Sequence, residues 1–122
     1  MDTRKTYKIT YDTGKSAIYK AYSCEIENGK VYACEKALVG DQGAPAVWSA
    51  EHITKIEELT GRPAAIIRKM SGLSQDAFSR KYSIPKRSIE NWEAASDTAY
   101  REPPEYLLKL LERVVREDYN LH

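Results

Sequence analysis

The sequence is poor in the residues from which disulfide-stapled, metal-bound and membrane-spanning proteins are built. Only two of its 122 residues are cysteine and two are histidine, so we expect neither a disulfide framework nor a zinc site, which needs about four ligands. No run of roughly 18 apolar residues is present, which excludes a transmembrane helix. The N-terminal stretch MDTRKTYKITY also lacks the apolar segment of a secretory signal. These absences predict a cytoplasmic protein that does not bind membranes.

Catalytic motifs are equally scarce. His52 is the one internal histidine, and neither a nucleophile motif nor a glycine-rich phosphate loop accompanies it. An isolated histidine in a strand or turn is usually an ordinary surface residue. The sequence therefore predicts a protein that is not an enzyme and needs no cofactor. The overall charge, 19 basic against 18 acidic residues, indicates no partner by itself.

Residues 1–60 are predicted to form strands joined by turns. Tyr7, Ile9 and Tyr11 alternate with polar residues, the period of a half-buried strand. Further strands are expected at 16–26, 30–39 and 46–48, with a breaker-rich loop at 40–45. The segment 49–59 is ambiguous, because Ser49 could cap one helical turn, and we favour a strand after it. The tyrosines either cover a thin core or form a surface for a protein partner.

The two cysteines flank a strong hairpin signal. Asn28-Gly29 suits a two-residue turn between antiparallel strands. If these residues form the loop, Cys24 pairs with Ala33 and Cys34 pairs with Ser23. Their side chains then lie on opposite faces of the sheet, so the hairpin predicts two free thiols.

Residues 61–122 are predicted to form helices. Gly61 and Pro63 mark the boundary, and the first helix carries an apolar stripe of Ala64, Ile67 and Met70. Ser74 is a natural N-cap for a helix over 75–82, and a turn at 83–85 precedes a helix that begins at residue 86. The last helix is opened by the prolines at 103–104. The fold class is therefore α+β, with a small antiparallel β-sheet domain at 1–60 followed by a helical bundle at 61–122.

Charge is distributed unevenly along the helical half. Residues 62–87 contain seven basic residues against Asp76 alone, a net charge of 7 − 1 = +6, whereas residues 88–122 contain four basic and eight acidic residues, 4 − 8 = −4. A basic cluster on a nearly neutral chain is typical of a surface that faces phosphates. The alternative is a solvated helix face, which usually has mixed signs.

Residues 73–93 carry a helix-turn-helix pattern. Its positions are Leu73, Ser74, Gln75, Phe78, Ile84, Ile89, Trp92 and Glu93. Through them the segment strongly resembles the Xre type of helix-turn-helix, found in lambdoid phage repressors, Cro proteins and many bacterial antitoxins. With the flanking helices the resemblance covers about residues 62–115. Ser79, Ser83 and Ala95 depart from the family pattern, which has alanine, glycine and glycine there, so Ser83 must hold or avoid the positive φ that glycine adopts freely.

The resemblance implies a lambda-repressor-like bundle and assigns roles to individual residues. Gln75 opens the positioning helix and bonds a backbone phosphate, while Lys86, Arg87 and Asn91 face base edges in the major groove and Ser88 lies near the backbone. Arginine and lysine suit the O6/N7 edge of guanine, and asparagine suits the N6/N7 edge of adenine. Sequence-independent phosphate contacts are expected from Arg68, Lys69, Arg80 and Lys81. The alternatives are a solvated face for Lys86 and Arg87 and a Gln75 that touches only water.

These expectations predict a sequence-specific DNA-binding protein that regulates transcription by inserting a helix into the major groove of double-stranded DNA. The alternative is an antitoxin-like or phage-encoded inhibitor whose main target is a protein, with DNA binding autoregulatory or lost. In the DNA-binding regulator, the β-rich half would mediate dimerisation or bind a protein partner.

We also expect a homodimer, because one recognition helix reads only about four or five base pairs and the family uses two-fold symmetry. In the last helix, Leu107, Leu111 and Val114 would satisfy the core, which leaves Leu108 and Val115 as candidate dimer contacts. An exposed sheet edge in the β-rich half is the other candidate surface.

Overall fold

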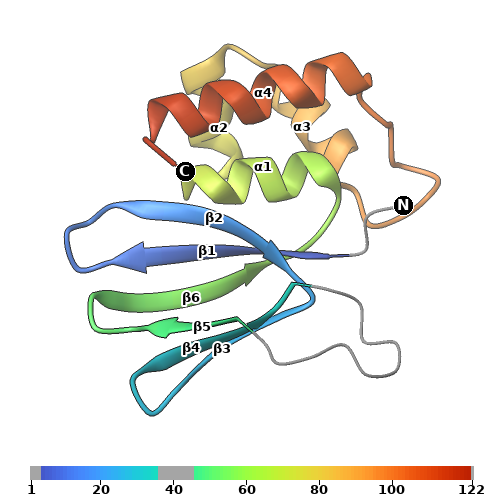
Figure 1. Ribbon diagram of the computed structural model, residues 1–122. Coiled ribbons are helices and arrows are strands. Elements are labelled where there is room, and N and C mark those ends of the chain that lie inside the picture. Colours follow the sequence, from blue (N-terminus) through green and yellow to red (C-terminus); the bar gives the residue numbers. More distant parts are fainter. Residues whose placement is uncertain (1–3, 36–45, 122) are drawn as a thin grey trace. The chain divides into compact units, whose positions relative to one another are not determined.

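The computed structural model describes residues 4–35 and 46–121 and has an α+β fold, as predicted. The chain divides between Leu59 and Thr60 into two compact units. We call the first the β unit and the second the helical unit (Figure 1). Each unit contributes its own group of buried apolar side chains.

Two antiparallel sheets of three strands make up the β unit, in the orders β2-β1-β6 and β3-β4-β5. The strands are β1 (Lys5–Tyr11), β2 (Ser16–Ala21), β3 (Ser23–Glu27), β4 (Lys30–Cys34), β5 (Ala46–Ser49) and β6 (Ile53–Leu59). Only Tyr22 separates β2 from β3, and its amide donates to the Cys34 carbonyl at 2.7 Å. One nearly continuous stretch of chain therefore passes from the first sheet to the second (Figure 1).

Local turn signals account for the connections in this unit. Ser49 accepts a hydrogen bond from the amide of Glu51 at 3.2 Å, and β6 follows directly at Ile53. The strand favoured for the ambiguous segment is thus confirmed after one short turn. The continuation of β4 predicted for residues 36–39 and the loop predicted at 40–45 lie outside the described residues.

The hairpin register predicted from Asn28-Gly29 is confirmed. Both turn residues have positive φ, 51° and 75°, as the tight hairpin turn requires. Cys24 pairs with Ala33 and Cys34 with Ser23, which leaves the two cysteines on opposite faces of the sheet. No disulfide joins them.

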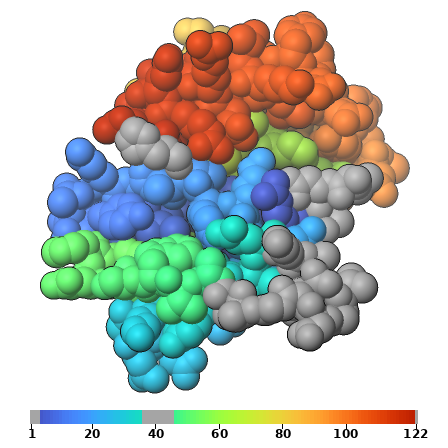
Figure 2. Space-filling view, viewed as in Figure 1, coloured from blue at the N-terminus to red at the C-terminus, as the bar shows by residue number. Residues whose placement is uncertain are grey.

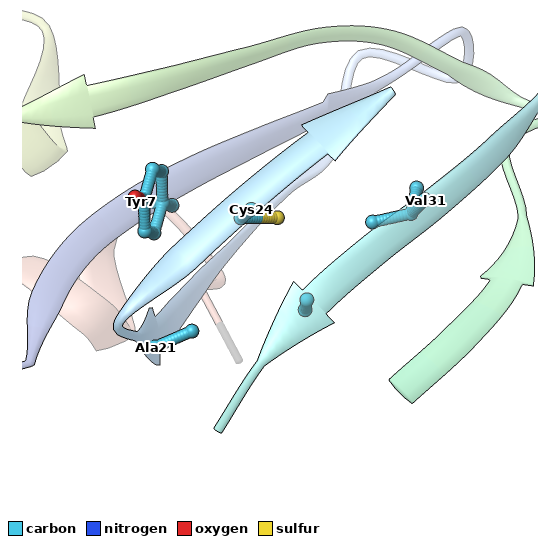
Figure 3. Packing of buried hydrophobic residues seen from close by; sticks show 5 residues of the cluster. Tyr7, Ala21, Cys24 and Val31 are labelled. Atoms are coloured by element: carbon cyan, nitrogen blue, oxygen red, sulfur yellow. The ribbon is translucent and has the colours of Figure 1, made fainter. Parts of the chain in front are cut away.

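The core of the β unit draws one side chain from each of several strands. Tyr7, Ala21, Cys24 and Val31 come from β1, β2, β3 and β4 and are buried together (Figure 3). The ring of Tyr19 packs edge-on against Trp48 beside this cluster, with centroids 5.5 Å apart. Such aromatic pairs add to the stabilisation from apolar burial. Tyr7 and Tyr19 therefore serve the core, the first of the two roles considered for the tyrosines.

Four helices form the helical unit: α1 (Pro63–Ser71), α2 (Gln75–Tyr82), α3 (Lys86–Glu93) and α4 (Glu105–Asp118). The predicted stripe of α1 is buried, and the helix ends at Gly72 in the left-handed conformation, φ 76°. α4 packs on α1, and the two lie side by side in Figure 1. Phe78 of α2 and Ile89 of α3 are also buried, and Trp92 of α3 is partly buried. Among the described residues, no helix has the length and apolar content needed to cross a membrane.

The orientation of α4 differs from the prediction. Leu111 and Val115 are buried, whereas Val114 is 38% exposed and Leu110 is 56% exposed. Successive helical residues are rotated by about 100°, so positions 111 and 115 lie on one face and position 114 lies away from it. The expected roles of Val114 in the core and of Val115 in a dimer contact are therefore wrong. Tyr106, Leu110 and Val114 form an exposed stripe on α4 instead, and α4, in red, covers much of its unit in the view of Figure 2.

Candidate nucleic-acid interface

The helix-turn-helix is closed by backbone and hydroxyl hydrogen bonds. Ser74 caps α2 as predicted, since its hydroxyl accepts from the Ala77 amide at 3.1 Å. At the turn, Ser83 holds the left-handed conformation, φ 54°, rather than avoiding it. The Ile84 amide donates to the Ser79 carbonyl at 3.1 Å, and the Ser79 hydroxyl donates to the Ile84 carbonyl at 2.6 Å. Two of the departures from the family pattern thus lie in one bonded turn.

α3 presents a polar row opposite its buried side chain. Ile89 is 1% exposed, and Arg87 and Asn91 lie on the opposite face of the helix because they precede and follow it by two residues. Arg87 is exposed and Asn91 is half-buried. Within the described part of the chain, Arg87 makes no ion pair. A guanidinium and a carboxamide therefore stand one turn apart on the outer face of α3.

The side chain of Lys86 is exposed but forms an ion pair with Asp76. Its ammonium lies 2.9 Å from a carboxylate oxygen of Asp76 on α2, with side chains 47% and 63% exposed. The hydrogen bond and charge of Lys86 lower the pKa of Asp76, and those of Asp76 raise the pKa of Lys86. Lys86 therefore lies on an exposed face but is paired there with Asp76. Ser88 is half-buried on the same helix.

Arg68 and Glu93 form a nearly buried ion pair beneath the helix-turn-helix. Arg68 Nε and Nη2 donate to the two carboxylate oxygens of Glu93 at 2.7 and 2.8 Å, and Nη1 donates to the Leu73 carbonyl at 2.8 Å. The side chains are 16% and 8% exposed, and the hydrogen bond to Glu93 raises the pKa of Arg68. We therefore correct the expectation that Arg68 contacts phosphate, because its guanidinium ties α1 to α3.

Gln75 belongs to the same network. Its Nε2 donates to a carboxylate oxygen of Glu93 at 3.2 Å, so it does not touch water alone. The bond orients the carboxamide at the first residue of α2. Its contact with phosphate remains a prediction.

The other side chains predicted to contact phosphate, Arg80, Lys81 and Lys69, differ in the contacts they make within the protein. Arg80 is exposed on α2, one turn after Asp76, and its charge helps to lower the pKa of that carboxyl. Lys81 is also exposed, but its ammonium lies 4.8 Å from the centre of the Tyr119 ring. Lys69 donates to the Thr60 carbonyl at 2.7 Å. Of these three cations, Arg80 is the one that shares the outer face of α2 with Asp76.

A further basic residue, Arg62, has a structural role. Its Nε donates to the Ala94 carbonyl at 3.1 Å, and its Nη2 lies 2.9 Å from a carboxylate oxygen of Asp97. The guanidinium also stacks over Tyr100 at 3.9 Å from the ring centre. Cation–π contacts of this kind favour arginine. Arg62 holds the segment between α3 and α4, so the net charge of the basic segment overstates what its surface offers to phosphate.

The exposed and half-buried polar side chains of α2 and α3 are basic, amide and hydroxyl groups together with the carboxylates of Asp76, Glu90 and Glu93. Among residues 4–35 and 46–121, no three histidine, cysteine, aspartate or glutamate side chains are grouped to hold a metal ion. Comparison with protein-family models, with curated proteins and with solved structures gave no match. The residues and their geometry therefore carry the functional argument.

Proposed function

We propose that this chain is a sequence-specific DNA-binding protein that regulates transcription in the cytoplasm of its host. The observation that carries the proposal is the outer row of α3. Arg87 is exposed and makes no ion pair within the described residues, and Asn91 follows one turn later. Bidentate contacts from arginine to guanine and from asparagine to adenine are the commonest ways to read these bases in the major groove.

The surrounding structure supports the insertion of α3 into a groove. The major groove is wide enough to admit an α-helix such as α3, and α2 braces α3 across a turn closed by Ser79 and Ile84. Lys86, at the start of α3, would also face a base edge, and Ser88 would lie near the DNA backbone. Arg80, Lys81 and Lys69 would supply sequence-independent attraction to phosphates. Gln75 stands at the N-terminus of α2, where a helix end favours an anion.

A duplex selection followed by a salt titration tests the proposal. The full chain would be offered a randomised duplex pool, and binding of the recovered duplex and of a scrambled one would be compared at 50 and 200 mM salt. We expect tighter binding to the recovered duplex at both concentrations and weaker binding to both duplexes at the higher one. Recovery of no preferred duplex, with no salt-dependent binding, would contradict the proposal.

A protein target is the second candidate function, corresponding to an antitoxin-like or phage-encoded inhibitor. It is favoured by apolar side chains on the two edge strands of the second sheet, where Ile26 on β3 and Val47 on β5 are 45% and 48% exposed. Exposed apolar groups on strands that are outermost in a sheet, as β3 and β5 are among the described residues, suit addition of a partner strand. Loss of protein capture in a Val47→Lys variant, with DNA binding unchanged, would support this role for the β unit.

A homodimer would let the proposed regulator recognise a longer DNA site. Two copies of α3 related by two-fold symmetry would read half-sites about 10 base pairs apart. The exposed α4 stripe of Tyr106, Leu110 and Val114 is the surface we propose for it, in place of the pair predicted from sequence.

A further inference from the structure

Asp76 holds an unusual place in the proposed interface. It is the single acidic residue between Arg62 and Arg87, and it lies in the first turn of α2 with its side chain 63% exposed. Phe78 is buried on the opposite side of the helix, so Asp76 and Arg80, one turn apart, share the outward row of α2. An anion therefore stands on the surface that the proposed function requires to face phosphates.

The position of its carboxylate is set by the recognition helix. Asp76 Oδ1 lies 2.9 Å from the ammonium of Lys86, which is the first residue of α3. Lys86 and then Arg80 lower the pKa of Asp76, so the carboxyl is ionised at neutral pH. An acidic residue also stabilises a helix N-terminus, but that role alone does not require a bond to α3.

This pair changes how Lys86 can serve DNA. A lysine that contacts phosphate adds the same attraction to every sequence, because it releases counterions whatever the bases are. Lys86 bonded to Asp76 adds little net charge to such binding, and the carboxylate itself repels phosphate. A guanine edge offers two acceptors, O6 and N7, and can draw Lys86 from an exposed ion pair, which is weak.

We propose that Asp76 is a specificity-determining residue of the DNA interface, which restrains Lys86 and so suppresses binding to non-cognate duplexes. This assignment rests on the proposed function. Asp76 thereby widens the difference in affinity between the preferred duplex and all others. Removing the Asp76 carboxylate would strengthen binding to duplexes of any sequence and reduce the difference in affinity between the preferred duplex and the others.

The test compares the parent chain with D76N on the recovered and the scrambled duplex, with Kd measured by fluorescence anisotropy from 50 to 200 mM salt. D76N should bind the scrambled duplex roughly two- to fivefold more tightly, the size of an exposed charge interaction, with a smaller gain on the recovered duplex. Its plot of log Kd against log salt concentration should steepen by about 0.9, since one more phosphate is neutralised. D76E, which keeps a carboxylate within reach of Lys86, should restore the parent's slope and discrimination.

Two further variants isolate the mechanism. E58Q removes a carboxylate that also pairs with a lysine, Lys5 at 3.4 Å, in the β unit, and should leave the slope unchanged. In a K86M background the D76N substitution should lose most of its effect, because no lysine is released. The assignment of Asp76 would be wrong if D76N strengthened binding to the scrambled duplex as much in the K86M background as in the parent. It would also be wrong if the parent and D76N both bound DNA with equal salt slopes. Neither result would count against the proposed function. A parent chain without DNA binding would overturn the proposed function as well.

Discussion

Ser79 and Ile84 are joined across the turn of the helix-turn-helix, where the Ser79 hydroxyl donates to the Ile84 carbonyl at 2.6 Å. The bond spans the residue at which the chain turns, Ser83, whose φ of 54° costs an L-residue roughly 1–2 kcal/mol. A typical hydrogen bond contributes about 0.5–1.5 kcal/mol. Serine at position 79 therefore offsets much of the strain of having serine rather than glycine at position 83.

We expect Ser79→Ala to lower the free energy of unfolding by about 1 kcal/mol. Ser83→Gly should raise it by up to about 1 kcal/mol, because relief of the left-handed strain exceeds the added entropy of the unfolded chain. Urea unfolding of the full chain, followed by circular dichroism at 222 nm, measures both. Gly72→Ala is the matched control, because Gly72 also has a positive φ, 76°. An alanine there would be strained, so this variant should be less stable than the parent. An unchanged Ser79→Ala midpoint would show that the hydroxyl bond contributes nothing.

The ion pair between Arg68 and Glu93 makes a second prediction about stability. Arg68→Ala leaves the carboxylate of Glu93, whose side chain is 8% exposed, without its two charged donors. We expect a loss of about 2–4 kcal/mol, near the cost of breaking a buried pair. Arg68→Met combined with Glu93→Leu should recover part of that loss, because neither charge is then stranded. Urea unfolding of Arg68→Met, of Glu93→Leu and of the double variant would give the coupling energy, and additive losses would contradict a direct pair.

Signals within a few residues of one another were enough to predict much of the fold. Asn28-Gly29 set the hairpin register and Ser74 set the start of α2, because turn and cap geometry depend on adjacent backbone. The Arg68–Glu93 pair joins residues 25 apart in sequence, and no local pattern distinguishes these two charges from their solvated neighbours. Arg68 was therefore predicted at the surface.

The rotation of α4 about its axis could not be predicted from the sequence, for a different reason. The apolar residues of α4 cover more than one face of the helix. Val114 and Val115 differ by about 100° around the helix axis, so the rotation of α4 about that axis decides which of them enters the core. Packing against α1 decides this, and α1 begins at Pro63, 105 − 63 = 42 residues before α4 begins at Glu105. At the candidate site, the types of residue on α3 were predictable from the motif, but the Asp76–Lys86 contact between helices was not.

The thiol of Cys24 should react slowly in the folded chain. Burial, and then the charge of Glu25, raise the pKa of this thiol, so less of the reactive thiolate is present near neutral pH than in the unfolded chain. Alkylation of Cys24 should therefore accelerate as the pH is raised toward and above the usual thiol range. Mass spectrometry without reductant should find two alkylated cysteines after denaturation. An intramolecular Cys24–Cys34 bridge would contradict the observed register.

Variants on the two rows of the helix-turn-helix separate base reading from phosphate attraction. Arg87→Ala should cost roughly 1–3 kcal/mol on the preferred duplex and relax the preference at one base position. Arg80→Ala should weaken binding to all duplexes alike and reduce the salt slope by about 1. Lys81→Ala should have a smaller effect, because its ammonium lies 4.8 Å from the Tyr119 ring. Fluorescence anisotropy on the preferred and scrambled duplexes compares all three, and parent-like binding by every variant would show that these residues do not meet DNA.

The exposed stripe of α4 predicts how two copies associate. Tyr106, Leu110 and Val114 are 69%, 56% and 38% exposed and are spaced four residues apart, so they follow one side of the helix. In an antiparallel contact centred on Leu110, this residue meets its own copy and Tyr106 meets Val114 of the second chain. Such a contact is isologous, as two-fold symmetry requires, and pairs a large side chain with a smaller one.

Leu110→Lys should therefore convert the protein to a monomer without unfolding it, because an exposed leucine contributes little to the core of its own chain. Light scattering at micromolar concentration should give the parent a mass near twice 13.9 kDa and the variant a mass near that of one chain. Val47→Lys is the matched control, since Val47 is 48% exposed on the edge strand β5. Dissociation by Val47→Lys alone would place the dimer at the sheet edge. A parent mass of one chain, with DNA bound as a single half-site, would show that no dimer forms.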